Sequence, residues 1–236
     1  MHERGEPLAP IGSLIVVKLS GRLLYPPSAD YIAGITRVVS EIEGMGFKVG
    51  FVVGGGELAR SYIEALRRLG LNEGLLDLMG IEASRLNASM LSKALYPRSP
   101  PVPITSIEEA LRVVQIGLIP VMGGLQPGQS TNAVAASLAE AGGGSVVLNA
   151  LRGVEGVYED EPGGRILRKL SYDDMERIIE GFERKAGTYT LWDRVALDIV
   201  RRSNIKVVFF DGSNPRNFIE ALMGIKGSIL GVEGGE

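Results

Sequence analysis

The chain alternates short apolar runs, rich in β-branched residues, with longer segments of helical periodicity. The runs "SLIVVKL", "KVGFVV", "SVVLNAL" and "IKVVFF" have the length and composition of buried strands. In the first half, helical patterns lie between them at residues 29–45, 57–69, 81–95, 106–115 and 130–141. Parallel strands need helical crossovers, so this order predicts an α/β fold with a mainly parallel sheet and helices on both faces.

Local signals mark where several of these helices begin. Ser106 with Glu109 forms a capping box, and Ser130 stands at the N-cap position of the next helix. In the second half, Ser171 with Asp174 opens a helix, and "TLWDRVALDIVRRS" has a helical period. Asn214 followed by Pro215 predicts an N-cap and first helical residue near the C-terminus. "LIPVMGG" is predicted to be a strand that runs into a glycine turn.

Composition excludes several classes of chemistry. The 236 residues fit one large α/β domain or two small lobes. The chain has no cysteine, and its single histidine is His2, which excludes thiolate sites and Ser-His-Asp triads. The net charge of −3 argues against nucleic acid as the main partner. No apolar run is long enough to span a bilayer, and the N-terminus does not resemble a secretory signal, so we expect no membrane partner and a cytoplasmic location.

Glycine is unusually frequent, with 32 residues, and several glycines follow predicted strands. The stretch "VVGGGELARSY" contains G-x-G-x-x-A at Gly54, Gly56 and Ala59, with Asp77 about twenty residues further on, as in a dinucleotide-binding fingerprint. That fingerprint belongs to the first strand of a fold, whereas these glycines follow the second, and Asp77 does not end a predicted strand. A Walker-A loop is absent, because no G-K-[ST] occurs.

Ligands of open α/β sheets bind beyond the carboxyl ends of the strands. Four segments place glycines or charged residues at that edge: residues 18–21, 54–60, 123–132 and 151–162. Two of them are glycine turns that enter helices, where free N–H groups and the helix dipole favour anions. With Lys18 at a neighbouring strand end and Arg60 one turn into a helix, the pattern predicts more than one phosphate site. The alternative is that the glycines only form turns and Lys18 is solvated.

Six motifs together resemble the archaeal uridylate (UMP) kinases of the amino-acid kinase superfamily. They are "VVKLSG", "VVGGGELAR", "LLDLMGIEASRLNA", "IPVMGGLQPGQST", "GVEGVY" and "KAGTYTLWD", and the resemblance extends from about residue 13 to 231. It implies a three-layer α/β/α sandwich forming a single domain over residues 1–236. Within it, an acceptor-binding lobe would cover about 1–143 and an ATP-binding lobe about 144–236. It also implies phosphorylation of UMP to UDP by ATP with Mg²⁺ in pyrimidine nucleotide biosynthesis, and a homo-oligomer, specifically a hexamer.

The resemblance implies roles for individual residues. Lys18 would neutralise the transferred γ-phosphoryl, with Arg60 and Asn132 as further catalytic residues, and no protein metal ligand is expected. The residues implied to contact ATP are Lys18, Gly21, Arg22, Gly56, Arg60, Arg152, Tyr158 and Glu161. The residues implied to contact UMP are Gly55, Asp77, Leu125, Gln126, Pro127, Gly128, Gln129, Ser130 and Thr131.

Alternatives remain for some of these residues. Asp77 could instead cap the following helix, and Tyr158 could belong to the core. Lys185, Thr188 and Asp193 either support the phosphates or begin a helix.

The sequence also departs from the superfamily pattern. An amide, Asn132, stands where much of the superfamily has an aspartate, "LRGVEGVY" differs from the usual stretch before "GVY", and Glu161-Pro162 replaces Asp-Pro. These departures leave open a second class, a nucleotide-binding sensor or regulatory protein without turnover. Isopentenyl phosphate kinases have a similar layout but use an active-site histidine, which this chain lacks.

Overall fold

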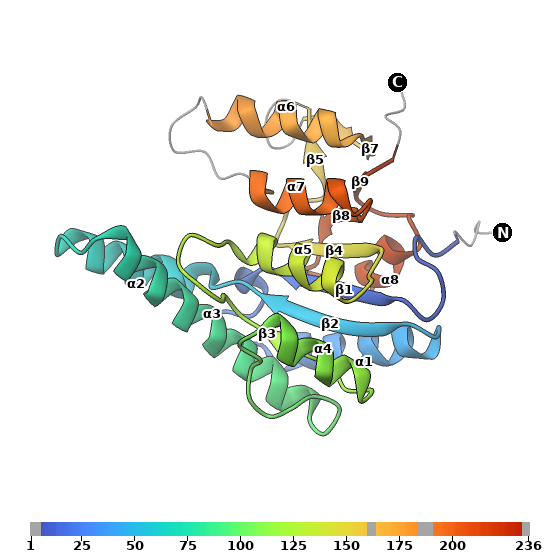
Figure 1. Cartoon of the computed structure of the whole chain (residues 1–236), viewed down its shortest axis with the longest axis horizontal. Helices are drawn as coiled ribbons and strands as arrows, with labels where there is room; N and C mark the ends of the chain where they lie inside the picture. The colour runs from blue at the N-terminus through green and yellow to red at the C-terminus, as the bar shows by residue number, and fades with distance from the viewer. Residues whose placement is uncertain (1–5, 160–163, 184–190, 233–236) are drawn as a thin grey trace.

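A computed structural model describes residues 6–159, 164–183 and 191–232 of the chain. Its main feature is one seven-stranded sheet with the order β3-β2-β1-β4-β8-β9-β7 (Figure 1). The strands are β1 (Leu14–Leu19), β2 (Lys48–Val53), β3 (Val121–Met122), β4 (Val146–Leu151), β7 (Lys169–Leu170), β8 (Lys206–Asp211) and β9 (Ser228–Leu230). All neighbours pair in parallel except β8 and β9. The predicted α/β class with a mainly parallel sheet is therefore confirmed.

Helices cover both faces of this sheet and make three layers. One face carries α4 (Ile107–Gln115), α5 (Thr131–Ala141), α6 (Tyr172–Glu183) and α7 (Arg194–Arg202). The other carries α1 (Ala29–Gly44), α3 (Glu73–Leu95) and α8 (Asn217–Leu222). Because side chains alternate across a strand, each central strand supplies both cores: Val16 of β1 packs under α5, whereas Val17 faces the opposite layer.

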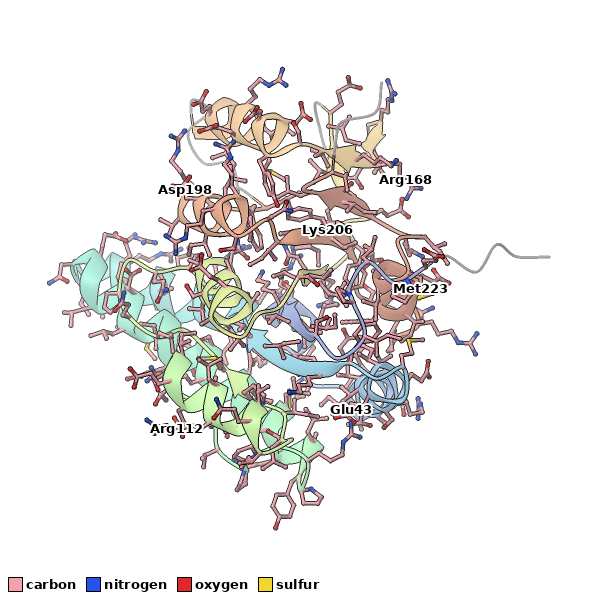
Figure 2. All side chains as sticks on the ribbon, turned by 45° about the vertical axis from the view of Figure 1, so that its right-hand side comes forward. Glu43, Arg112, Arg168, Asp198, Lys206 and Met223 are labelled. Atoms are coloured by element: carbon pink, nitrogen blue, oxygen red, sulfur yellow. The ribbon has the colours of Figure 1, made fainter. Side chains whose placement is uncertain are left out.

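Four further elements complete the described fold. A short 3₁₀ helix, η1 (Gly21–Leu23), follows β1, and β5 (Val157–Tyr158) pairs with β6 (Ile166–Leu167) in an antiparallel hairpin. Helix α2 (Gly56–Arg68) packs on α3, and Figure 1 shows this pair projecting beyond the sheet at the left. Figure 2 labels the charged side chains of Glu43, Arg112 and Asp198 on α1, α4 and α7, of which Arg112 and Asp198 are exposed.

Three predicted helix caps are confirmed. At the start of α6 the Ser171 hydroxyl accepts a hydrogen bond from the Asp174 N–H, and the Asp174 carboxylate accepts one from the Ser171 N–H. The Ser106 side chain accepts a hydrogen bond from the backbone N–H of Glu109 at the start of α4. Ser130 accepts one from Ala133 at the start of α5. No described helix is long and apolar enough to cross a membrane.

Several predicted boundaries were wrong. Helix α3 begins at Glu73, with Asn72 as its N-cap, eight residues before the predicted start. Gly74 and Gly80 weaken the helical pattern of its first turns, so the start was placed too late. Gly80 lies where α2 packs closely on α3, since a Cβ there would be 3.3 Å from Ile63. Helix α7 begins at Arg194, later than the sequence pattern indicated, because Asp193 caps it.

The predicted start of the last helix was also wrong. The Asn214 side chain accepts a hydrogen bond from the Arg216 N–H in a tight turn, and α8 begins only at Asn217. The strand predicted in "LIPVMGG" is reduced to the two residues of β3. At residues 214–216 a turn stabilised by a local hydrogen bond replaces the first turn of the predicted helix.

Candidate active site

Two glycine turns lie backbone against backbone at the carboxyl edge of the sheet. A Cβ on Gly21, just after β1, would lie 2.2 Å from the Gly54 carbonyl oxygen. A Cβ on Gly56 would lie 2.4 Å from the Gly21 carbonyl carbon, and Gly56 has φ of +62°. Only residues without a side chain fit this approach. It brings the ends of β1 and β2 together at the N-terminus of α2, a favourable position for an anion.

Helix α3 holds the backbone of the glycine turn after β2 and of the loop after β3 from one side. The buried Asn87 amide donates to the carbonyl oxygens of Gly54 and Gly55 at 3.0 and 3.2 Å. The buried Ser84 hydroxyl accepts from the Gly124 N–H at 2.7 Å. The Arg85 guanidinium donates to the carbonyl oxygens of Gly124 and Leu125. These residues, which the sequence analysis did not select, fix the shape of the turns after β2 and β3.

A pocket of about 380 Å³ opens between these turns. The lining residues are Gly55, Ile63, Asp77, Gly80, Ile81, Ser84, Gly124, Gln126, Gly128, Gln129, Ser130 and Thr131. Seven of the nine residues predicted to contact UMP are in this set; Leu125 and Pro127 lie in the same loop but do not line the pocket. Ile63 and Ile81 add an apolar wall, and backbone and amide groups supply most of the rest. The volume and this mixture suit a small polar ligand with an apolar face.

Asp77 lies in α3 and faces the loop after β3. Its carboxylate accepts a hydrogen bond from the Gly128 N–H at 2.8 Å. Since Asn72 caps α3, the alternative that Asp77 caps a helix is wrong. Asp77 therefore links α3 to the loop at the mouth of the pocket, with an exposed carboxylate beside the pocket space.

Lys18 stands one residue before the end of β1 and is only 3% exposed. It lies on the sheet face covered by α5, because it alternates in phase with Leu14 and Val16. Asn132, in the first turn of α5, is also buried, and its Nδ2 atom donates to the Leu191 carbonyl oxygen at 3.4 Å. A buried cation thus lies at the strand end beside the glycine turns, within a mainly apolar face that also holds Asn132.

The start of α5 is joined to the start of α7. The Ser130 hydroxyl donates to the Asp193 carboxylate, and the same carboxylate caps α7 through the Ala196 N–H. Of the two interpretations of Asp193, the structure therefore confirms that it begins a helix. Lys185 and Thr188 lie outside the described residues.

Polar contacts also organise the loop after β4, which contacts η1. The Arg152 guanidinium donates to the Arg22 carbonyl oxygen at 2.9 Å, and Arg22 forms an ion pair with Glu57 at 3.4 Å. Both Arg22 and Glu57 are about half exposed, so this pair is weak and easily rearranged. Arg60 is exposed on the first turns of α2, and Tyr158 is half-buried on β5. Glu161 lies outside the described residues.

Asp211, at the end of β8, anchors that loop. Its carboxylate accepts hydrogen bonds from the N–H groups of Gly153 and Ser213 and from the Ser213 hydroxyl. Burial acts to raise the pKa of Asp211, but these hydrogen bonds and the positive Lys226 outweigh it and lower the pKa. Burial, followed by the charge of Asp211, raises the pKa of Tyr31, whose hydroxyl donates to the Gly212 carbonyl oxygen. The carboxylate thus stays ionised and the phenol neutral at neutral pH.

The structure gathers the predicted residues into two neighbouring groups around the glycine turns. The first is the pocket between α3 and the loop 124–131. The second comprises Gly21, Arg22, Gly56, Arg60 and Arg152. Lys18 lies at the strand end between them. The fold is a mainly parallel sheet between two layers of helices. At its carboxyl edge it carries a buried lysine, helix N-termini and a small-ligand pocket, and this combination defines an α/β protein that binds phosphorylated ligands.

Comparison with known proteins specifies this class. The sequence model described as "Amino acid kinase family" matches residues 13–211. The chain therefore belongs to the amino acid kinase family.

Individual relatives are uridylate kinases. The chain is 57% identical to the uridylate kinase of Aeropyrum pernix over 220 residues, covering 92% of this chain and 98% of that one. It is 42% identical to the uridylate kinase of Hyperthermus butylicus, with 89% and 94% covered. The crystal structure of uridylate kinase from Archaeoglobus fulgidus matches with a TM-score of 0.80 at 32% identity, covering 92% of this chain and 99% of that one. UMP kinase from Bacillus anthracis shares the fold, with a TM-score of 0.76 at 21% identity over 94% and 96% of the two chains.

Proposed function

We propose that this chain is a uridylate kinase, which transfers the γ-phosphoryl group of ATP to UMP and yields UDP and ADP. The observation that carries the proposal is the pocket between α3 and the loop 124–131, which adjoins the strand end that carries Lys18. The 57% identity to a uridylate kinase over nearly the whole of both chains supports it. Nothing in the comparisons favours the alternative of a non-catalytic sensor.

UMP would occupy the pocket, with its phosphate toward Gly55 and the N-terminus of α2. Asp77 would accept hydrogen bonds from the ribose hydroxyls, since its carboxylate faces the pocket. The loop 125–131 would surround the base, with Leu125 and Pro127 shaping its backbone and Gln126, Gly128, Gln129, Ser130 and Thr131 facing the ligand. Backbone donors and acceptors at fixed positions distinguish uracil from cytosine, because the wrong base leaves buried polar groups unpaired.

ATP would bind on the other side of the glycine turns. Its phosphates would lie beside the two turns that Gly21 and Gly56 bring together, while Arg22, Arg60 and Arg152 would supply positive charge. Tyr158, together with Glu161, would contact the nucleoside. In this arrangement residues of about 1–143 form most of the acceptor lobe, and about 144–236 form most of the ATP lobe.

The chemistry needs positioning and charge neutralisation more than proton transfer. The phosphate of UMP is already a dianion at neutral pH, because its second pKa is near about 6, so it attacks without a general base. Lys18 and Arg60 would stabilise the charge that develops on the transferred group, and Asn132 would hold neighbouring donors in place.

Mg²⁺ would enter with ATP. Within the described ranges, no group of three or more Asp, Glu or His side chains could hold a metal ion. Mg²⁺ that enters with a nucleotide usually keeps several waters and takes phosphate oxygens as ligands. The bound ion would neutralise phosphate charge, and we assign it no protein ligand.

The wider setting is also a proposal. Formation of UDP would place the protein in pyrimidine nucleotide biosynthesis, and the resemblance to archaeal uridylate kinases suggests a cytoplasmic hexamer.

The test is an acceptor panel with Mg·ATP: UMP, CMP, dUMP, acetylglutamate and isopentenyl phosphate, with ADP and the phosphorylated product measured. We expect UMP to give by far the highest kcat/KM. Equal turnover of CMP would contradict the proposed base recognition. Binding of ATP and UMP without formation of ADP would favour the sensor.

A further inference from the structure

Asn149 is a polar residue in the middle of an otherwise apolar strand. It lies in β4, whose six residues "VVLNAL" are all buried, and its own side chain is fully buried. Among the described residues, neither its Oδ1 nor its Nδ2 atom has a hydrogen-bond partner. Buried polar side chains nearly always have partners, because an unpaired amide loses its hydration without compensation. An amide at this position therefore indicates a partner that the apolar core does not supply.

The position of Asn149 in the sheet identifies that partner. In the parallel pairing of β1 with β4, Asn149 is the register neighbour of Lys18. Both residues alternate in phase with side chains of the core under α5, so they lie on the same face. Adjacent strands are about 4.8 Å apart, and a lysine side chain easily covers that distance. No described residue forms a hydrogen bond or ion pair with Lys18, whose side chain is only 3% exposed and whose ammonium has three donors.

Further polar atoms without described partners lie in the same core. The Oδ1 atom of Asn132, in the first turn of α5, is one of them, and the indole N–H of Trp192 is another. Trp192 packs edge-on against Phe209, which is the register neighbour of Asn149 on β8. Acceptors from β4 and α5 and a donor from Trp192 thus occur on the face that holds the lysine. This layer differs from the surrounding core, which is built from aliphatic and aromatic side chains.

We propose that Asn149 is a positioning residue for Lys18. Its Oδ1 atom accepts a hydrogen bond from a water molecule that in turn accepts one from the Lys18 ammonium, and this link fixes the ammonium at the strand end. The inference rests on the proposed function, in which Lys18 faces the transferred phosphoryl group. An amide suits this task because it is neutral: it orients the ammonium and leaves its charge for the phosphate. A carboxylate would cancel that charge, and an aliphatic side chain would leave the cation unpaired.

Two substitutions of equal shape test the proposal. Asn149→Val and Asn149→Thr are both β-branched and suit a strand, but only threonine keeps an oxygen that accepts a hydrogen bond. We expect Asn149→Val to lower kcat about tenfold or more, with KM for UMP and ATP changed less than about twofold. Asn149→Thr should keep kcat within about threefold of the native value. A packing defect would affect both variants alike, so equal losses would overturn the proposal.

Ser145 provides the matched control. Its hydroxyl, just before β4, is also buried without a described partner, but it lies four residues from Asn149, at the far end of the strand. Ser145→Ala should leave kcat unchanged.

A second measurement does not depend on turnover. In protein labelled with ¹⁵N-lysine, the Lys18 ammonium signal, assigned with Lys18→Arg, should be observable in the native protein and in Asn149→Thr. It should be broadened or lost in Asn149→Val, because an unpaired ammonium exchanges its protons faster. An unchanged Lys18 signal in Asn149→Val would overturn the role of Asn149 even if UMP proved not to be the substrate. Failure of the native protein to form UDP, with the ammonium signal responding as expected, would instead overturn the proposed function alone.

Discussion

The carboxylate of Asp77 accepts a hydrogen bond from the backbone N–H of Gly128 at 2.8 Å, across 51 residues of sequence. This contact ties α3 to the loop after β3 and sets the width of the pocket between them. The same carboxylate faces the pocket, where it would meet the ribose of UMP. Asp77 therefore both stabilises the loop after β3 and is a candidate contact for the ligand.

Replacement of Asp77 tests that double role. Asp77→Ala should weaken UMP binding by roughly 1–3 kcal/mol, the usual effect of losing a charge-assisted hydrogen bond. ATP binding should stay nearly native, because Asp77 lies on the acceptor side. Isothermal titration with each nucleotide measures both affinities, and Asp198→Ala, at an exposed position of α7, is the control. Equal loss of both affinities would point to a general folding defect.

Lys18→Ala should lower kcat by about 10²–10³, which is typical for the loss of one group aimed at developing charge. UMP affinity should change little, because the lysine faces the transferred group. Steady-state kinetics with equilibrium binding of UMP separates the two effects. Lys48→Ala, at the exposed start of β2, should behave like the native protein. A near-native kcat in Lys18→Ala would contradict the proposed catalytic role of Lys18.

The contact between the two glycine turns predicts that alanine substitution has different effects on stability at Gly21 and at Gly44. Gly21→Ala should destabilise the protein by about 1–3 kcal/mol and disturb ATP binding, since its Cβ would lie 2.2 Å from the Gly54 carbonyl oxygen. Gly44→Ala, near the end of α1, meets nothing within 4 Å and should be neutral or stabilising by up to about 1 kcal/mol. Chemical denaturation measures both changes. A tolerated Gly21→Ala would show that the turns separate easily.

The Asn132 amide predicts a simple pH profile. An amide cannot act as a base near neutral pH, so the rate should fall at low pH only as the UMP phosphate gains its second proton, with an apparent pKa near about 6. Protonation makes the phosphate a weaker nucleophile, so activity is present above that pKa and is lost as the pH falls through it. Asn132→Ala should slow turnover without abolishing it. An inactive Asn132→Ala variant that still binds UMP and ATP would contradict this role.

Much of the architecture was predictable because its signals are local. Apolar β-branched runs and helical periods indicated a mainly parallel sheet between helices, and side-chain caps marked the starts of α4 and α5. The start of α3 was missed because Gly74 and Gly80 weaken the helical pattern. Gly80 is accommodated by packing against α2, which no window of sequence reveals.

The sequence by itself determined the four central strands β1, β2, β4 and β8, the glycine turns and the identities of the residues that can meet a phosphate. Residue type and spacing fix these, since backbone freedom at glycine and the charge of lysine are local properties. Only the tertiary structure decided which of these groups meet. Strand register places Asn149 beside Lys18, and α3 supplies Ser84, Asn87 and Asp77 to turns that lie more than thirty residues away. Such contacts depend on how strands pair and helices pack, and these arrangements become defined only when distant segments share one core.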